Sequence, residues 1–585
     1  MKRTQLFTKT SKTAPADEVA RNAQLLIRAG FIHKEMAGAY AFLPLGLRVI
    51  EKIKNIVREE MNAIGGQETM MTALQPRELF ERTNRWDDAV VDNWFKTELK
   101  SGVKLGLGLT HEEPFTISVG EYAQSYKDFP LFVYQIASKF RNELRAKSGI
   151  LRCREFLMKD MYSFARSQTE HDELYEQAAA AYTRVYDRLG IGDITFRTKA
   201  DGGYFTENYS DEYQTLSLIG EDTLFHVPGT DKWFNQEVAP SQAPLLDNQD
   251  KEEKPLENVE GEGVIGVNAL AKMLGITPEQ TTKTMLYVTD SGEVVAAAVR
   301  GGYDINEIKL RKVLNVKSLK LADEETVRKV TGAEIGYAGL LNLPKEVRVI
   351  VDESCANRTN FEMGGNQTNL HAMNVNWGRD LPSPEKFFDI KTAKEGDLDP
   401  ETGQIYEVER SIEAGNIFPL ESKYTDALDV YYTDEKGERQ SIIMGCYGIG
   451  ISRVMGIIAE VFADDRGLVW PKSVAPFQVY LINIGDDEEV LREATAIYKD
   501  LQVNGAEVIW DDRPEARPGE KFADADLMGI PWRVVVSAKT LNKNGFELKA
   551  RASDETLDVG PRELILKILG QEFTDENVDK LKFVR

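Results

Sequence analysis

The chain concentrates arginine in one short stretch, although it is acidic overall. Residues 140–160 read FRNELRAKSGILRCREFLMKD, with six basic side chains against three acidic ones. The whole chain has 72 Lys plus Arg, 95 Asp plus Glu and a formal charge of −23. Apolar residues are interleaved with the charges, which is untypical of a fully solvated face. Because guanidinium groups bind phosphate and carboxylate through paired hydrogen bonds, this stretch predicts a partly buried anion site.

A second candidate for binding phosphate is GIGISR, at residues 448–453. The glycines allow the backbone to approach a ligand closely, and Arg453 comes at the start of an apolar helical pattern. A helix N-terminus with an arginine is suited to a phosphate. The sequence contains no Gly-x-x-x-x-Gly-Lys-Ser/Thr, which argues against a P-loop nucleotide site. Cys446 has no base near it in the sequence, so we expect it to line a pocket rather than to act as a nucleophile.

Helices and strands must position these residues. Apolar residues at helical spacing predict a helix over 44–66, which ends in a glycine pair, and a strand over 67–76. The segments 131–144 and 153–165 are typical of two strands around the arginine-rich loop. A further helix is predicted over 171–190.

The middle of the chain has a different composition. Residues 241–262 are acidic, contain proline and have few apolar side chains, which is typical of a linker. A compact α/β pattern follows it, and the chain ends in an alternating βα pattern. The second of these parts therefore looks inserted into the first.

Composition excludes several classes of protein. A length of 585 residues suggests about four domains, and three distant cysteines offer neither a disulfide framework nor a zinc knuckle. No apolar run approaches the ~20 residues of a membrane span, and the N-terminal stretch lacks the apolar core of a secretory signal. We therefore expect a cytoplasmic protein with no membrane partner. Its acidity disfavours non-specific nucleic-acid binding, so DNA is not an expected partner.

The two arginine motifs together resemble motifs 2 and 3 of the class II aminoacyl-tRNA synthetases. MMTALQP (70–76) and the helix before it resemble motif 1, and GLTHEEPF (108–115) resembles the amino-acid loop of the prolyl-tRNA synthetases. Four longer segments are similar to the bacterial-type enzymes of that family: LRCREFLMKDMYSF, MGCYGIGISR, RGLVWPKSVAPFQV and DDRPEARPGEKFADADLMGIP. The resemblance covers essentially the whole chain.

This resemblance implies a multidomain α/β fold. It comprises a class II catalytic core built on an antiparallel sheet, an inserted α/β editing domain and a C-terminal α/β anticodon-binding domain. The expected boundaries are 1–240 for the first part of the core with motifs 1 and 2, 241–262 for the acidic linker, 263–404 for the editing domain, 405–472 for the second part of the core with motif 3, and 473–585 for the anticodon-binding domain.

The resemblance also implies an activity. The expected reaction is ATP-dependent activation of proline to prolyl-adenylate and transfer to the 3′ end of tRNA(Pro), with hydrolytic editing of alanyl-tRNA(Pro). Proline, ATP with Mg²⁺ and tRNA(Pro) are then the partners, zinc is not expected, and the enzyme is a homodimer.

Five residues are expected to meet ATP. By the resemblance, Arg141 holds the α-phosphate and the proline carboxylate. Phe156 stacks on adenine, and Arg453 lies on the opposite face. Glu143 accepts from the adenine amino group or orients the site, and Arg152 meets the outer phosphates.

Another five residues are expected to bind proline together with Arg141. Thr110 and Glu112 would meet its secondary ammonium. Met158, Tyr162 and Cys446 would line the pocket for its ring. Two further assignments concern other ligands. Arg145 would touch the tRNA acceptor stem, unless it is only an exposed arginine in a salt bridge, and Glu212 matches a glutamate expected to bind Mg²⁺ with ATP.

The insertion is expected to edit because a pocket fitted to proline rejects alanine weakly, a missing methylene being worth only about 1–3 kcal/mol. Lys283, Asp352 and His371 match the positions that carry editing in the family. The chain departs from the family in three places. It has GEGV (261–264) where Thr-Pro is usual, GGYFTENYSDEYQ (202–214) without the usual histidine, and LGLGLTHEE (105–113) without the usual proline. These departures concern substrate contacts and editing rather than the class.

Other functions remain open at the level of sequence. A synthetase-like paralogue that binds tRNA without catalysis would be expected to lose an ATP-contacting arginine, yet Arg141, Arg152 and Arg453 are present. A stand-alone editing protein would not need the ATP motifs. A threonine or serine enzyme is disfavoured by the Thr-x-Glu loop, and a threonine enzyme would also need zinc ligands.

Overall fold

The computed structural model describes residues 1–146, 148–203, 205–206, 208–246 and 252–584. It divides into two compact units, which we call the core unit and the insert unit. The core unit comprises residues 1–196, 202–215 and 413–585, and the insert unit comprises residues 197–201 and 216–412. Among the described residues, no helix is both long and apolar enough to cross a membrane.

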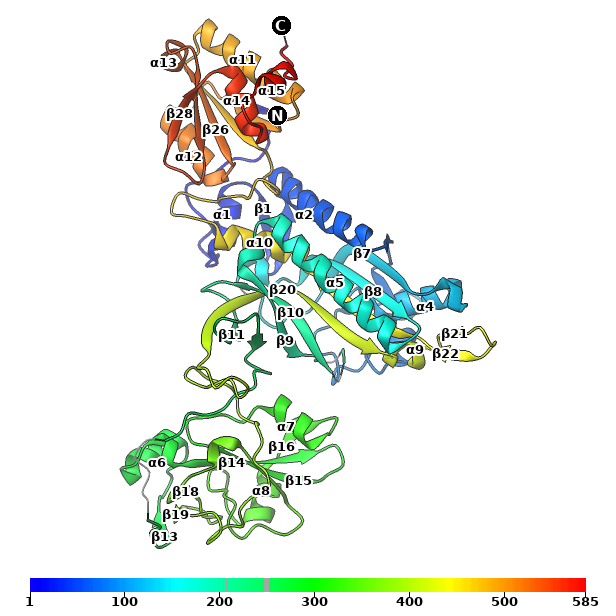
Figure 1. Cartoon of the computed structure of the whole chain (residues 1–585), viewed down its shortest axis with the longest axis vertical. Coiled ribbons are helices and arrows are strands. Elements are labelled where there is room, and N and C mark those ends of the chain that lie inside the picture. Colours follow the sequence, from blue (N-terminus) through cyan, green and yellow to red (C-terminus); the bar gives the residue numbers. More distant parts are fainter. Residues whose placement is uncertain (147, 204, 207, 247–251, 585) are drawn as a thin grey trace. The chain divides into compact units, whose positions relative to one another are not determined.

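An antiparallel sheet forms the centre of the core unit (Figure 1). Its strands, in spatial order, are β20 (Glu407–Glu421), β23 (Ile443–Ile449), β8 (Glu155–Ala165), β7 (Leu131–Phe140) and β3 (Gly66–Glu68). The neighbours run antiparallel, except that β3 is parallel to β7. β20 begins in the insert unit and ends in the core unit, and β10 (Tyr209–Leu216) also pairs with it. The predicted antiparallel sheet is confirmed.

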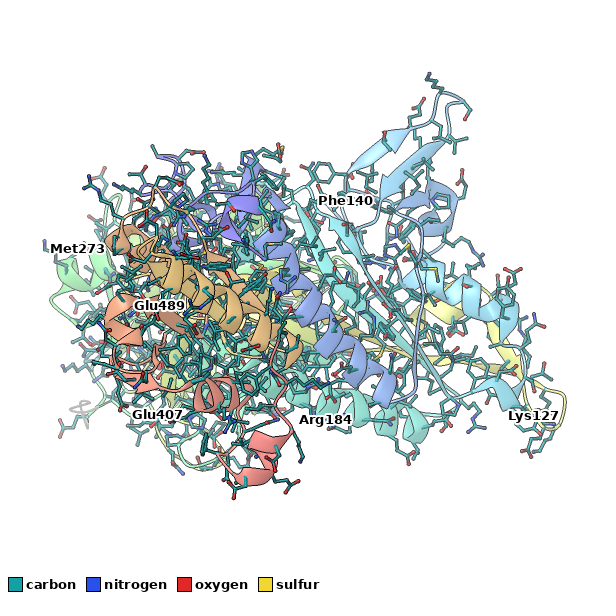
Figure 2. All side chains as sticks on the ribbon, turned by 90° about the horizontal axis from the view of Figure 1, so that it is seen from above. Lys127, Phe140, Arg184, Met273, Glu407 and Glu489 are labelled. Carbon is teal, nitrogen blue, oxygen red and sulfur yellow. The ribbon has the colours of Figure 1, made fainter. Side chains whose placement is uncertain are left out.

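Three helices cover one face of this sheet: α2 (Pro44–Ala63), α5 (Gln168–Leu189) and α10 (Ile451–Val461). α5 starts where the Ser167 hydroxyl accepts from the Glu170 amide and ends at Gly190, whose φ of 83° suits a residue without a side chain. Arg184 of α5, labelled in Figure 2, donates from Nε to Glu60 of α2 at 2.7 Å. These contacts leave the opposite face of the sheet available for a site.

The side chains of β8 alternate between these two faces, as the pleat of a strand requires. Lys159 points toward α5, where its Nζ bonds to the hydroxyl of Tyr182 and to the carbonyl of Tyr447. Burial lowers the pKa of Lys159 to about 7. Met158, Asp160 and the other residues in step with them therefore point away from the helices.

The remaining elements of the core unit before its C-terminal module are short. They are α1 (Arg21–Arg28), β1 (Ile32–Met36), β2 (Ala39–Phe42), β4 (Leu74–Pro76), α3 (Arg77–Glu81), β5 (Lys96–Glu98), β6 (Lys104–Leu107), α4 (Glu112–Tyr122), α9 (Lys423–Ala427), β21 (Tyr431–Thr433) and β22 (Arg439–Ser441). The single strand expected over 67–76 is in fact two strands, because β3 pairs with β7 whereas β4 pairs with β6 in another sheet.

The C-terminal module contains a five-stranded mixed sheet in the order β25, β24, β26, β27, β28. Their bounds are β24 (Val479–Ile484), β25 (Val508–Asp511), β26 (Trp532–Ser537), β27 (Phe546–Ala550) and β28 (Thr556–Val559). The helices of the module are α11 (Glu488–Val503), α12 (Pro518–Met528), α13 (Ala538–Leu541), α14 (Pro561–Leu569) and α15 (Asp575–Asp579), and α11, α12 and α14 pack against the sheet (Figure 1). The alternating pattern predicted from the sequence is thus present.

The insert unit contains two small sheets and three helices. One sheet has the order β16 (Leu319–Leu321), β14 (Thr282–Thr289), β15 (Val294–Arg300), β17 (Arg348–Val351), and the other has the order β13 (Glu257–Glu260), β19 (Leu370–Val375), β18 (Phe361–Gly364). The helices are α6 (Val267–Leu274), α7 (Glu307–Leu314) and α8 (Glu324–Thr331). β9 (Thr195–Asp201), β11 (Asp222–His226) and β12 (Trp233–Asn235) complete it, with β11 pairing with the first half of β20.

The structure differs from the expected boundaries around the insertion. The unit begins near residue 216 rather than at 263, because β11 and β12 pair within it. The segment expected as a linker over 241–262 contains strand β13, which pairs with β19, and Ala243 is buried. Polar composition misled the prediction here, since β13 has charged residues on exposed positions. Residues 247–251 of the expected linker lie outside the described residues.

We predict that Gly46→Ala destabilises the protein. Alanine in a helix is usually about 1 kcal/mol better than glycine. At Gly46 in α2, however, a Cβ atom would lie 2.2 Å from the backbone oxygen of Phe31. We expect the free energy of unfolding to fall by roughly 1–3 kcal/mol, measured as a lower thermal midpoint.

The matched control is Gly519→Ala at the start of α12, where an added Cβ meets no atom within 4 Å. Its midpoint should be unchanged or higher. Equal midpoints for the two variants would show that the contact at Phe31 relaxes without cost.

Candidate active site

The floor of the candidate site is the face of β8 and β23 that points away from α5. The register places Tyr162 opposite Cys446 and Asp160 opposite Gly448. Alternation along β8 adds Phe156 and Met158 to the same face. The sheet thus brings the arginine-rich stretch and the glycine turn together, although about 300 residues separate them in the sequence.

The most deeply buried acidic group of this face is Glu112, the first residue of α4, which is 0% exposed. The Thr110 hydroxyl lies 2.7 Å from both of its carboxylate oxygens. The Tyr162 hydroxyl lies 3.3 Å from Oε1, and the Cys446 thiol lies 3.5 Å from the same atom. Four of the residues expected to bind proline, Thr110, Glu112, Tyr162 and Cys446, are therefore in mutual contact.

A buried arginine that the sequence analysis missed holds Glu112 in place. Arg85 Nη1 lies 2.9 Å from Glu112 Oε2 and 3.1 Å from Glu113 Oε1, and Arg85 is 2% exposed. Burial alone would raise the pKa of the Glu112 carboxyl, but Arg85 and the Thr110 hydroxyl lower it by more, so Glu112 is ionised. Burial, partly offset by Arg85, raises the pKa of Glu113.

A second buried network anchors the loop before α4 to the sheet. Lys139 Nζ lies 2.8 Å from Asp160 Oδ2 and 2.5 Å from His111 Nδ1. Burial and the Lys139 ammonium lower the pKa of His111 to about 4, so its ring is neutral and Nδ1 accepts. The other ring nitrogen, Nε2, then donates to the carbonyl of Thr72 at 3.1 Å. Asp160 also accepts from Gln135 at 3.0 Å.

The arginine-rich loop begins directly after Phe140, which is labelled in Figure 2 at the end of β7. The guanidinium carbon of Arg141 lies 5.3 Å from the centre of the Phe156 ring. Among the described residues, its buried Nε has no hydrogen-bond partner. A donor of this kind is costly unless a ligand satisfies it, which fits an anion at this point.

The rest of the loop is held by contacts among its own residues, which include the backbone carbonyl and the carboxylate of Glu143. Arg154 Nε donates to the Glu143 carbonyl at 3.1 Å, and the Glu143 carboxylate lies 3.9 Å from Arg152 Nε. Arg145 is exposed. A tertiary contact thus supports Glu143 and Arg152, whereas Arg145 faces solvent.

The glycine turn places Arg453 in the first turn of α10, as predicted. Its Nε donates to the Leu151 carbonyl at 2.8 Å, and its Nη1 lies 2.9 Å from Glu413 Oε2. Asn416 donates to the same carboxylate at 2.7 Å. Arg453 is therefore tied to the loop and to β20 and is about a quarter exposed. Glu212, on β10, accepts from Gln214 at 2.8 Å.

The insert unit contains a cavity of about 610 Å³. Lys283, Asp304, Glu362 and His371 contribute polar groups to its wall. Lys283 Nζ lies 2.6 Å from Asp304 Oδ1, and the buried His371 ring lies 3.0 Å from Glu362 Oε1 through Nδ1. Burial raises the pKa of Glu362.

Asp352, the third residue expected in editing, is not among the residues that line this cavity. It is fully buried, and its carboxylate accepts from the backbone amides of Ser354, Ile390 and Lys391 at 2.8–3.0 Å. Three amide donors satisfy the carboxylate within the fold. In this structure Asp352 therefore caps the turn after β17, whereas Lys283 and His371 line the cavity.

Comparisons with known proteins agree with this geometry. Residues 95–462 match the model of the class II tRNA synthetase core domain (G, H, P, S and T), and residues 478–571 match that of the anticodon binding domain. The chain is 41% identical over 569 residues to the proline–tRNA ligase of Geobacillus kaustophilus, covering 97% of this chain and 98% of that protein. It is 38% identical over 586 residues to the proline–tRNA ligase of Brachyspira hyodysenteriae, covering 98% and 99%. The chain belongs to the prolyl-tRNA synthetase family.

The predicted family and fold class are thereby confirmed, and the enzyme is a proline–tRNA ligase of class II. Among solved structures, the chain resembles the prolyl-tRNA synthetase of Cryptosporidium parvum complexed with halofuginone and AMPPNP, with a TM-score of 0.57. That match has 13% sequence identity and covers 96% of this chain and 78% of that one. A second structure of the same enzyme, complexed with L-proline and AMP, gives 0.56 at 14% identity. At such identity the likeness concerns the fold.

Several polar residues of the synthetase site were not predicted: Arg85, Gln135, Lys139, Asp160, Glu413 and Asn416. Lys139 lies on β7 and Asp160 on β8, and side chains alternate between the two faces along both strands. The two-residue period of each strand was therefore a usable signal for the face that they share. Arg85 gave no signal, because it lies between short elements and meets Glu112 only through tertiary folding.

We predict that Lys139→Met destabilises this prolyl-tRNA synthetase by roughly 3–5 kcal/mol, because Asp160 would be left as a buried charge without its cation. Adding Asp160→Leu should recover part of the loss, since replacing both partners removes the unpaired charge. Chemical denaturation of the two variants and the wild type gives these values.

The control is Lys232→Met, which removes the lysine of an exposed ion pair with Glu401. It should have no measurable effect, as is usual for surface pairs. A double variant no more stable than Lys139→Met would show that the buried pair does not act as a unit.

Proposed function

We propose that the core unit first forms prolyl-adenylate and then transfers the prolyl group to the 3′ end of tRNA(Pro). In the first step a carboxylate oxygen of proline attacks the α-phosphorus of ATP, a mixed anhydride forms and pyrophosphate leaves. No protein base is needed, because the attacking oxygen is already ionised. The enzyme acts by positioning and by stabilising negative charge on the transferring phosphorus.

The observation that carries this proposal is the ionised, fully buried carboxylate of Glu112 beside Thr110. A secondary ammonium needs an anion and a second acceptor, and both are present here. The ring of proline is proposed to lie among Tyr162, Cys446 and Met158. Tyr162 and Cys446 contact Glu112, and Met158 lies on the same face of the sheet.

The phosphate-binding residues are proposed from their contacts. The unsatisfied Nε of Arg141 suits the α-phosphate and the proline carboxylate. Phe156 offers a ring on which adenine can stack, and Arg453 covers the other face. Glu143 and Arg152 are proposed to meet the adenine amino group and the outer phosphates. Contacts to Glu413 and Leu151 already orient Arg453, so little side-chain freedom is lost on binding.

Mg²⁺ is proposed to enter with ATP and to neutralise charge on the pyrophosphate. Glu212 is the proposed protein ligand, because carboxylate oxygens suit Mg²⁺ and β10 pairs with β20, the strand that carries Glu413. Zinc has no part in the proposed reaction.

Binding of tRNA is proposed to use two separate parts of the core unit. Exposed Arg145 would contact the acceptor stem, and the module that matches the anticodon binding domain would read the anticodon. The proposal includes a cytoplasmic homodimer, with neither membrane nor DNA as a partner.

We predict that Arg141→Ala and Arg453→Ala each lower proline-dependent ATP–pyrophosphate exchange by about 10²–10³, because each removes a donor to a phosphate in a shielded site. Arg492→Ala, which changes an exposed arginine of α11, is the matched control and should retain full exchange. Near-normal exchange in a folded Arg141 or Arg453 variant would remove that residue from its role.

The insert unit is proposed to hydrolyse alanyl-tRNA(Pro). Its support is the cavity, large enough for an aminoacyl ester with part of the terminal nucleoside, and the presence there of Lys283 and His371. Lys283 is a third exposed and supplies a cation for the tRNA end. The contact with Glu362 fixes the orientation of the His371 ring in the wall of the cavity.

We predict that Lys283→Ala spares proline-dependent exchange and slows the release of alanine from alanyl-tRNA(Pro) at least tenfold, because it removes the cation that faces the cavity. Lys320→Ala, at an exposed position of β16 outside the cavity, is the control. Unchanged hydrolysis in the Lys283 variant would mean that the cavity has another use.

A further inference from the structure

The proline pocket contains an uneven set of buried charges. Arg85, Glu112 and Glu113, which we call the carboxylate triad, are each no more than 2% exposed. One guanidinium nitrogen, Arg85 Nη1, lies 2.9 Å from the first carboxylate and 3.1 Å from the second. With both carboxylates ionised, the triad has one positive and two negative charges. One cation is missing.

The other groups that face the triad do not supply that cation. Glu112 and Glu113 receive neutral donors from the surrounding elements: Thr83 at 2.7 Å, Thr110 at 2.7 Å, Tyr162 at 3.3 Å and Cys446 at 3.5 Å. On the α9 side, the ring of Tyr424 lies 5.4 Å from the Arg85 guanidinium. Among the described residues, Arg85 is the one cation in ion-pair contact with the two glutamates.

The charges behind Tyr162 balance one another. Lys139 pairs with Asp160 at 2.8 Å, and His111 between them and Glu112 is neutral. Arg141, on the loop, has the same charge as Lys139 and lowers the pKa of that lysine. Among the described residues it is not the ion-pair partner of either glutamate. Lys139 also acts electrostatically on Glu112, but without forming an ion pair with it. Within the described part of the chain, the triad therefore has one directly paired cation for two carboxylates.

We propose that the ammonium of proline supplies the missing positive charge and that its binding releases a proton from Glu113 to solvent. This inference rests on the proposed contact between Glu112 and that ammonium. In the empty pocket Glu113 holds the proton, and the triad is neutral. When proline binds, the O–H bond of Glu113 breaks, its electron pair stays on the carboxylate, and the ammonium balances the new charge.

The direction of this linkage follows from the structure. Burial raises the pKa of Glu113 in the free enzyme, with Glu112 adding to it and Arg85 opposing it. A substrate cation lowers that pKa. Proline affinity must then fall as the pH falls through the free-enzyme pKa of Glu113, by up to tenfold per pH unit for a single proton. Proline itself stays protonated at nitrogen over this range, so the proton comes from the protein.

The test is calorimetric titration of the full-length enzyme with L-proline in two buffers of different ionisation enthalpy. The difference in heat gives the number of protons released. The KM for proline in ATP–pyrophosphate exchange, measured between about pH 5 and 8, gives the slope. We expect proton release in the wild type and a KM that rises as the pH falls.

The isosteric variant Glu113→Gln identifies the group. It should release no proton, and its KM for proline should stay near the low-pH value of the wild type at every pH. Arg85→Met should raise the KM for proline at least tenfold without changing that for ATP, and Arg85→Lys should restore part of it. Arg82→Met, which removes an exposed arginine paired with Asp429, is the matched control and should leave both constants unchanged.

The outcomes separate this inference from the proposed function. Normal proline-dependent exchange with no proton release and a flat pH profile overturns the inference alone. Absence of proline-dependent exchange in the wild type overturns the proposed function as well. Proton release that persists in Glu113→Gln assigns the proton to another group and overturns the role of Glu113. If that variant does not fold, the wild-type titration still decides.

Discussion

The proposed proline site depends on one carboxylate, that of Glu112, which must stay ionised although it is buried away from water. A buried charge is strongly destabilising unless a partner compensates it. Arg85 is that partner, and its position requires the chain between α3 and β5 to lie against the start of α4. Tyr162 and Cys446 then complete the surroundings from two adjacent strands. Three separate parts of the sequence therefore meet at the carboxylate of Glu112.

The register of the central sheet decides which side chains take part. Because alternate residues of β8 point to opposite faces, Asp160 enters the site whereas Lys159, its neighbour, is buried against α5. A slip of one residue would exchange the two sets. The polar contacts on both faces oppose such a slip, because Asp160 pairs with Lys139 on one face and Lys159 bonds to Tyr182 on the other. Residues that are adjacent in the sequence therefore serve separate purposes: Asp160 belongs to the network that anchors the loop before α4, and Lys159 holds the helix layer.

The three residues of the insert unit that match family positions have different surroundings in the fold. Lys283, His371 and Asp352 were equally supported by the resemblance, yet only the first two line the cavity. Three backbone amides surround Asp352, so its charge stabilises the turn after β17. An aspartate at the end of a strand reads the same in sequence whether it faces a ligand or caps a turn. The distinction lies in the direction of its side chain.

The sequence by itself determined the family, the antiparallel core and the order of the core and anticodon-binding domains. It also predicted elements with clear periodicity, such as α2, α5, β7 and β8, because periodicity and turn residues are local properties of the chain. It also singled out Arg141, Thr110, Glu112 and Arg453 as candidate ligand-binding residues, and these assignments stay predictions. The tertiary structure decided what lies beside them. Arg85, the Lys139–Asp160 pair and Glu413 act through contacts across 21–40 residues or more, and no local pattern encodes such a meeting. Strand β13, hidden in an acidic segment, likewise forms only because β19 supplies its partner. Charge compensation and strand pairing are satisfied between distant segments, so only the folded chain shows where they occur.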